Sequence, residues 1–162
     1  MAGNDAKYPH EDFRPGCIFA IDRSLAGLPE QSNVPPALFR NPAGVEILRK
    51  LAAGLQVAGY KVSVPKPGVG CDAAMRVMFA GFRIIVIIHV DRDVAGLVSC
   101  ELRTWYATPI MSFARLLRHK PSQQGVVKWS ELCAALDREL KSSLKATSIE
   151  WLTREQLHLR VA

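Results

Sequence analysis

The chain has 162 residues, of which 49% are apolar and 22% are charged, and its formal net charge is +6. This length is typical of one domain with a real core, and the apolar share excludes a disordered chain. No apolar run approaches the roughly 20 residues that cross a bilayer, and residues 1–8 lack the pattern of a signal peptide. The sequence therefore predicts a cytoplasmic protein without membrane contact.

The first part of the chain is predicted to be an irregular N-terminal arm, residues 1–41, of a single domain that spans 1–162. Frequent prolines prevent a long helix there, and Cys17–Ile21 is apolar enough to form a short strand or a packed crossing segment. A helix follows, with Asn41 as N-cap, Pro42 in the first turn and Gly59 at the left-handed position that ends it.

A meander of strands is predicted next. Lys61–Val64 alternates as a half-buried strand does, and Met75–Ala80, Phe82–Val90 and Leu97–Tyr106 form three antiparallel strands joined by short turns. The central strand is apolar on both faces. Both faces of the sheet should therefore be covered there, by helices or by the N-terminal arm.

The C-terminal part mixes helices with one further strand. Ile110–Leu117 fits a short helix or an extension of the sheet, and Pro121–Gly125 is predicted to be a loop before a helix capped by Ser130. Thr147–Leu152 fits an edge strand, followed by a last helix over 154–160. The fold class is therefore α+β, a mainly antiparallel sheet of four to five strands with helices packed on it.

The cysteines predict neither a metal site nor disulfides. No pair has C-x-x-C spacing and no histidine lies at ligand spacing, so we expect buried free thiols and no cofactor. The four residues are Cys17, Cys71, Cys100 and Cys133.

The strand 97–106 carries the most informative surface of the sequence. Its alternate residues Val98, Cys100 and Leu102 belong to the core, so the intervening side chains form a polar face with an aromatic residue. Tryptophan beside charges is typical of a protein-binding hot spot. The predicted partner-binding residues are this face and the preceding turn: Asp91, Asp93, Glu101, Arg103 and Trp105.

The same residues allow a metal-dependent alternative. Asp91 or Asp93 followed by Glu101 and Arg103 is similar to the Mg²⁺-binding core of restriction-type nucleases. Arg103 stands where that family has lysine, however, and arginine does not give up its proton. His89 is interpreted as a satisfied residue at a strand end rather than a base. A non-enzymatic protein is therefore the favoured interpretation.

Basic residues gather in the second half of the chain, where residues 82–162 carry a net charge of +4 against +2 for residues 1–81. Such a patch attracts phosphate or an acidic protein, although no aromatic residue is interleaved with it for stacking on bases. The nucleic-acid-binding alternative rests on Arg115, Arg118, Lys120 and Lys128.

The chain resembles bacterial immunity proteins of contact-dependent growth inhibition systems in its size, its α+β pattern and its C-terminal sequence pattern. That C-terminal pattern runs from Trp129-Ser-Glu-Leu-Cys-Ala-Ala-Leu-Asp to Ile149-Glu-Trp-Leu-Thr153. The resemblance implies direct binding to a cognate toxin domain. Many such proteins are acidic, so this basic chain would need an acidic toxin surface, or a local acidic patch around Asp91, Asp93 and Glu101. A scaffold that pairs through a sheet edge is a third possibility.

Overall fold

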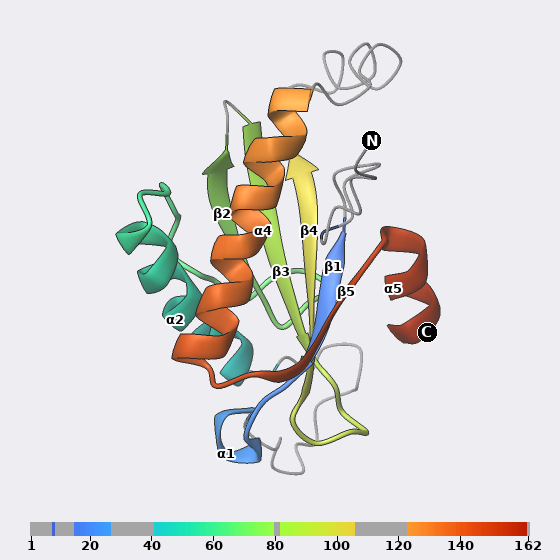
Figure 1. The fold of residues 1–162 in the computed structure, drawn as a ribbon. Coiled ribbons are helices and arrows are strands. Elements are labelled where there is room, and N and C mark those ends of the chain that lie inside the picture. The colour runs from blue at the N-terminus through green and yellow to red at the C-terminus, as the bar shows by residue number, and fades with distance from the viewer. Residues whose placement is uncertain (1–7, 9–14, 27–40, 80–81, 106–122, 162) are drawn as a thin grey trace.

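The computed structural model describes residue 8 and residues 15–26, 41–79, 82–105 and 123–161. They form a five-stranded antiparallel sheet with helices packed against it, which confirms the predicted α+β class (Figure 1). The strands are β1 (Gly16–Ala20), β2 (Ala73–Phe79), β3 (Phe82–Val90), β4 (Leu97–Trp105) and β5 (Thr147–Leu152). The helices are α1 (Arg23–Ala26), α2 (Ala43–Val57), α4 (Gln123–Ser143) and α5 (Arg154–Val161). In space the strand order is β2-β3-β4-β1-β5.

The predicted meander is present, and β3 has the predicted bounds Phe82–Val90. It pairs with β2 on one side and β4 on the other, so Val86 lies between Met75 and Leu102. Because side chains alternate along a strand, these three point to the same face of the sheet, and all three are buried. We call this side the core face.

The segment Cys17–Ile21 forms most of a strand, β1, and lies inside the sheet rather than across it. Cys17 pairs with Cys100 of β4 and with Trp151 of β5. The predicted edge strand Thr147–Leu152 is β5, with the predicted bounds. Thus the first strand of the chain is inserted between two strands that come later in sequence.

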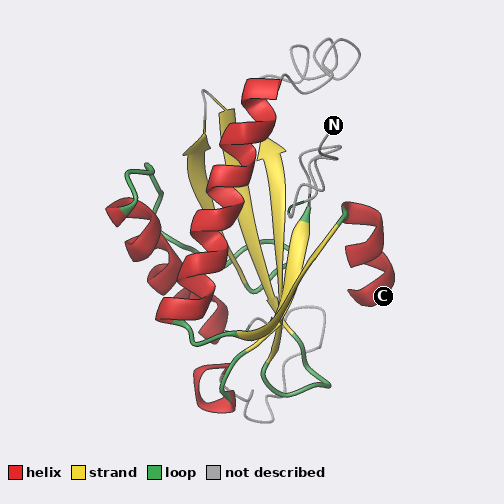
Figure 2. Cartoon of the chain, viewed as in Figure 1, coloured by secondary structure: helices red, strands yellow, loops and turns green. Residues whose placement is uncertain are grey.

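Two helices, α2 and α4, cover the core face (Figure 2). From α2 the fully buried residues include Leu48, Leu51 and Leu55, whose spacing makes one apolar stripe. The predicted start of the second helix was wrong. It begins at Gln123, not at Ser130, and therefore includes most of the expected loop 121–125 and places Trp129 in the core with no exposed surface.

The start of α2 is fixed by a buried carboxylate. Asn41 Oδ1 accepts the backbone N–H of Ala43 at 2.9 Å, as predicted for a cap, while helical geometry begins after Pro42. Asp72, only 9% exposed, accepts the backbone N–H groups of Asn41 and Val90, each at 2.7 Å. One side chain thereby joins the helix start, the approach to β2 and the end of β3.

Both long helices are followed by a left-handed residue, and the next residue donates a hydrogen bond back to the helix. In α2, Tyr60 N–H donates to Leu55 O and Gly59 has φ +95°, the left-handed turn predicted for it. In α4, Ala146 N–H donates to Leu140 O and the left-handed position, φ +52°, is held by Lys145. The second turn thus uses a conformation that glycine adopts more easily.

The last helix, α5, lies on the opposite face of the sheet. Its predicted capping box is present: Thr153 N–H donates to Gln156 Oε1 at 2.9 Å, and Gln156 N–H donates to Thr153 Oγ1 at 3.2 Å. Leu157 packs over β1 at Gly16, where an added Cβ would lie 2.4 Å from Leu157 Cδ2. This close approach explains why β1 carries no side chain at that point.

On the core face the helices cover β3 as expected. On the opposite face Ile87 of β3 is also buried, and most of the N-terminal arm lies outside the described residues. The main contacts of α5 are with β1 and β5. A second correction concerns Lys61–Val64, which is no regular strand. It runs beside β2 through isolated bridges, one of them Val62 to Val77, because Pro65 and Pro67 interrupt the ladder.

Candidate functional site

The face of β2, β3 and β4 opposite the core face carries several exposed or half-buried side chains. Register places its side chains in rows that run across the three strands: Arg76 lies beside Ile85 and Ile85 beside Arg103, while Arg83 lies opposite Trp105. We define the basic face as the exposed or half-buried side chains of these rows: Arg76, Met78, Arg83, Ile85 and Arg103. Met78 is 41% exposed and is the large apolar side chain among the exposed members of this face.

Two of the three arginines on the basic face form no ion pair within the described part of the chain. Arg76 and Arg83 are exposed, and neither makes an ion pair with any described residue. The sequence-based prediction missed both. The available signal was their alternation with core residues, since Arg76 lies between Met75 and Val77. Unpaired cations that flank an isoleucine leave this face ready for an acidic partner.

Arg103 is the exception, because it forms an ion pair with the buried carboxylate of Glu101. Its Nε and one terminal nitrogen donate to the two oxygens of Glu101 at 2.7 and 3.0 Å. Burial raises the pKa of Glu101, but the hydrogen bonds and charge of Arg103, with smaller contributions from His158 and His89, outweigh it and hold that pKa below its usual value. Glu101 is therefore an internal anion that positions Arg103, and it adds nothing to an exposed acidic patch.

In the middle of β4, the residues of the predicted polar face are less exposed to solvent than expected. Ser99 and Glu101 are only 9% and 7% exposed. Glu101 lies opposite Gly16, the position on which Leu157 of α5 packs, so the last helix shields this part of the sheet. The exposed part of the face begins at Arg103.

The two turn aspartates lie far from Glu101. Asp91 follows the pair Val90–Val98, whereas Glu101 pairs with Ile87, four residues earlier than Asp91 on β3. At about 3.3 Å per residue this separates the two positions by about 13 Å along the strands. The register therefore does not bring Asp91 and Glu101 together as the ligands of one Mg²⁺ ion.

Asp91 is already used by its own turn. Its Oδ1 accepts the backbone N–H groups of Asp93 and Val94 at 2.8 and 2.7 Å, and both aspartates are exposed. In the part of the chain that the structure describes, no group of three or more His, Cys, Asp or Glu residues could hold a metal ion.

The remaining predicted residues are only partly described. The backbone of Trp105 ends β4 in register with Arg83, while its side chain lies outside the described part. Arg115, Arg118 and Lys120, with the segment Ile110–Leu117, also lie outside it. Lys128 is exposed on α4, which packs on the core face, so it is not part of the basic face.

His89 lies on the same side of β3 as Ile85 and is half-buried. Burial lowers its pKa, and Arg103 adds to the effect, while Asp72 and Glu101 oppose it. The ring is therefore held towards its neutral form by its surroundings. The structure places Ser99 directly opposite His89, and Ser99 is buried.

The cysteines are free thiols, as predicted, and three are buried in the core: Cys17, Cys100 and Cys133. Cys17 and Cys100 face each other across β1 and β4. Their hydrogen bond, followed by burial, raises the pKa of Cys17 well above its ordinary value, and burial also raises that of Cys133. Such thiols are poor nucleophiles.

A hollow of about 440 Å³ opens beside the basic face, between the segment 63–67 and strands β2 and β3. Its lining includes Ser63, Lys66, Arg76 and Ile85. The hollow is open to solvent at one side, and no acidic residue is among its described lining residues.

Both edges of the sheet carry features that oppose pairing with another strand. The β2 edge is followed by the segment 61–67, where Ser63 N–H donates to Arg76 O and Lys66 pairs with Ala74. The β5 edge has a register shift, with Ser148 at φ +52°. A bulge of this kind twists an edge strand and interrupts its hydrogen-bonding groups. The sheet edges are therefore not where we place the function.

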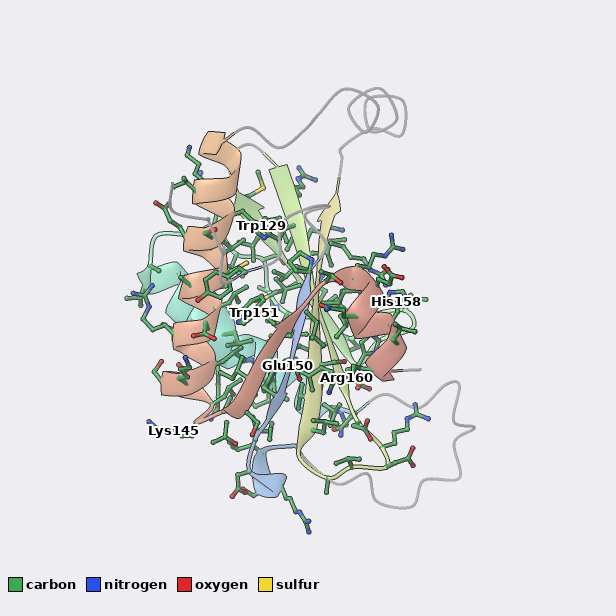
Figure 3. All side chains as sticks on the ribbon, turned by 45° about the vertical axis from the view of Figure 1, so that its right-hand side comes forward. Trp129, Lys145, Glu150, Trp151, His158 and Arg160 are labelled. Atoms are coloured by element: carbon green, nitrogen blue, oxygen red, sulfur yellow. The ribbon has the colours of Figure 1, made fainter. Side chains whose placement is uncertain are left out.

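The C-terminal tryptophans are structural. Figure 3 shows Trp151 and Glu150 on opposite sides of β5, with Trp151 towards α4. Trp151 Nε1 donates to Asp137 Oδ1 at 3.1 Å, and its ring meets Tyr8 edge-on at 5.0 Å. On the other side Glu150 pairs with Arg160 of α5 at 3.1 Å. These contacts tie α4, β5 and α5 to each other.

No protein-family model, curated protein or solved structure matches the chain. Among the described helices, none has the length and apolar character that a bilayer span requires.

Proposed function

We propose that this protein is a non-enzymatic binding module that neutralises a toxin domain by direct contact, as immunity proteins do, and that the basic face is its contact surface. One observation supports the proposal: Arg76 and Arg83 are exposed and form no ion pair with a described residue, on a sheet face where the main contacts of α5 are with β1 and β5. Met78, which is 41% exposed, lies on the same face and adds apolar area to it.

The charge of the face selects the partner. An acidic surface on the toxin domain would be attracted to the basic face, and charge complementarity of this kind speeds association and rejects wrong partners. The net charge of +6 acts in the same direction. Met78 and Ile85 supply apolar area that becomes buried in such a contact.

The proposal expects a neighbouring gene to encode a toxin domain, and the absence of one counts against it. The direct test is co-expression of that domain with the wild-type protein or with Arg76→Glu/Arg83→Glu. We expect the wild type to protect the cells and the double variant to fail, with binding weakened by about 100-fold or more, since like charges across an interface cost several kcal/mol. Arg138→Glu, an exposed charge reversal on α4, is the matched control. Binding that is unchanged in the double variant contradicts the proposed surface.

Arg103 is a poor choice for this test, although it belongs to the face. Truncating it leaves Glu101 buried without its cation, which destabilises the fold itself. Arg76 and Arg83 change the surface without this effect.

A nucleic-acid backbone is the second candidate partner, because the same exposed arginines would bind phosphates. This alternative predicts that affinity for an oligonucleotide falls linearly with salt on logarithmic axes. Fluorescence anisotropy with single- and double-stranded oligonucleotides measures it, and no binding at low salt rules it out.

A further inference from the structure

The hollow beside β2 brings two cations to one side of the sheet. Lys66 pairs directly with Ala74, and directly paired residues place their side chains on the same face. Ala74 and Arg76 both belong to the side of β2 opposite the core face. Lys66 and Arg76 therefore lie on the same side of the sheet, on two neighbouring segments, and both line the hollow.

Ser63 supplies a third donor. Its Oγ accepts the backbone N–H of Arg76 at 2.9 Å, which fixes the hydroxyl at the edge of the hollow. Because the oxygen acts as acceptor in that bond, its own hydrogen stays available for a ligand. Lys66 and Arg76 form no ion pair with a described residue, so neither charge is already compensated.

The rest of the lining is apolar. Ile85 forms the floor, and Val64 and Pro67 line the side contributed by the segment 63–67. Val64 is 74% exposed, a large apolar area at the rim. No aromatic residue is among the described lining residues, so the hollow offers no stacking surface for a base. An anion with apolar neighbours fits these walls better than a nucleotide.

From this arrangement we infer that the hollow binds a carboxylate from an acidic, partly apolar segment of the partner protein. Lys66, Arg76 and Ser63 receive the glutamate or aspartate, and an adjacent apolar side chain of the partner packs on Ile85 and Val64. The inference rests on the proposed function, since it names the group through which a partner engages the basic face.

The test uses a defined peptide rather than the partner. An isotope-labelled sample of the whole protein is titrated with an acetylated Glu-Leu-Glu-Leu-Glu peptide, and backbone amide shifts are mapped by NMR. We expect saturable shifts centred on Ser63, Lys66, Ala74 and Arg76. The neutral Gln-Leu-Gln-Leu-Gln peptide should give no saturable shifts there.

Variants then assign the binding to the two cations. Lys66→Gln and Arg76→Gln should each weaken the peptide about tenfold, because each removes a charge-assisted hydrogen bond. Both residues are exposed, so the fold is retained, and unchanged spectra away from the hollow verify it. Arg138→Gln on α4 removes a cation from elsewhere on the surface and should leave the affinity unchanged.

Three outcomes overturn the inference: equal shifts with the neutral peptide, shifts that map away from the hollow, or tighter binding of oligothymidylate than of the acidic peptide at these residues. The proposed function is judged separately by co-expression. Protection of cells without peptide binding at the hollow would refute the inference alone. Peptide binding without protection would refute the toxin-neutralising function and leave the carboxylate site standing.

Discussion

Asp72 should be among the most sensitive polar positions in the protein. Its two carboxylate oxygens accept backbone N–H groups from Asn41 and Val90, residues that are 31 and 18 positions away in sequence. Asn41 is 5% and Asp72 is 9% exposed, so water has little access to either group. We expect Asp72→Ala to leave two buried donors without partners.

The size of the effect follows from these bonds. A hydrogen bond to a charged group contributes about 1.5–3 kcal/mol, so losing both lowers the free energy of unfolding by about 3–6 kcal/mol. Asp72→Asn keeps one oxygen but turns an amide donor towards the second N–H, so it should lose about 1.5–3 kcal/mol. Either loss is a large part of the stability of an ordinary domain.

Urea unfolding at neutral pH measures the effect, with the slope of the transition used to verify that unfolding exposes the same surface. Asp91→Ala is the matched control. Asp91 also accepts two backbone N–H groups, at 2.8 and 2.7 Å, but in an exposed turn where water replaces them. We expect the control to lose about 1 kcal/mol or less. Equal losses in the two alanine variants would refute the role assigned to burial at Asp72.

Three further perturbations test other parts of the structure. Arg103→Gln should raise the pKa of Glu101 and destabilise the protein at neutral pH. The lowered pKa of the wild type gives stability that is present above the unfolded value of about 4.3 and is lost as pH falls, so the difference between the two proteins should shrink at acid pH, as followed by urea unfolding at several pH values. Gly16→Ala should displace Leu157 of α5 and also crowd Cys100 O of β4, which an added Cβ would approach to 2.5 Å, at a cost of about 1–3 kcal/mol, with faster hydrogen exchange in α5 and in the β1–β4 pairing. Lys145→Gly should stabilise by about 0.5–1 kcal/mol in thermal melts, whereas Gly59→Lys should destabilise, because both positions have a left-handed backbone.

Local patterns were enough to predict most of the fold. The capping box of Thr153 and Gln156, the C-terminal Gly59 and the apolar run of β3 depend on neighbours in sequence, so the residues that form each pattern also form the contact. The insertion of β1 between β4 and β5 has no such signal, because pairing between distant strands depends on the whole chain.

The predictions that failed share a cause. The sequence places good capping chemistry at Ser130, but burial of Trp129 favours a longer α4, and tertiary packing outweighs a local cap. Lys61–Val64 alternates as a strand does, but the prolines that follow remove donors from the ladder. In both segments the local sequence favours the predicted structure, but tertiary packing in the first and the neighbouring prolines in the second outweigh that preference.

The candidate site could be predicted only in outline. Alternation along β4 correctly assigns Leu102 and Arg103 to opposite faces. It cannot show that Glu101 is buried, because that burial depends on α5, which packs beside it at Gly16. Arg76 and Arg83 become part of the same surface only through the register of β2 and β3 with β4. A surface assembled from three strands is a property of their alignment rather than of any one of them.

The place of β1 in the sheet also bears on synthesis. As the chain leaves the ribosome, residues 16–20 emerge first but find neighbours only when β4, at 97–105, and then β5, at 147–152, have followed. The meander β2-β3-β4 can form meanwhile, since its strands are adjacent in sequence. β1 then docks on its open side, and β5 completes the sheet. Until β5 has been made, the apolar segment around Phe19 has an unpaired edge, and such an edge can pair with other chains.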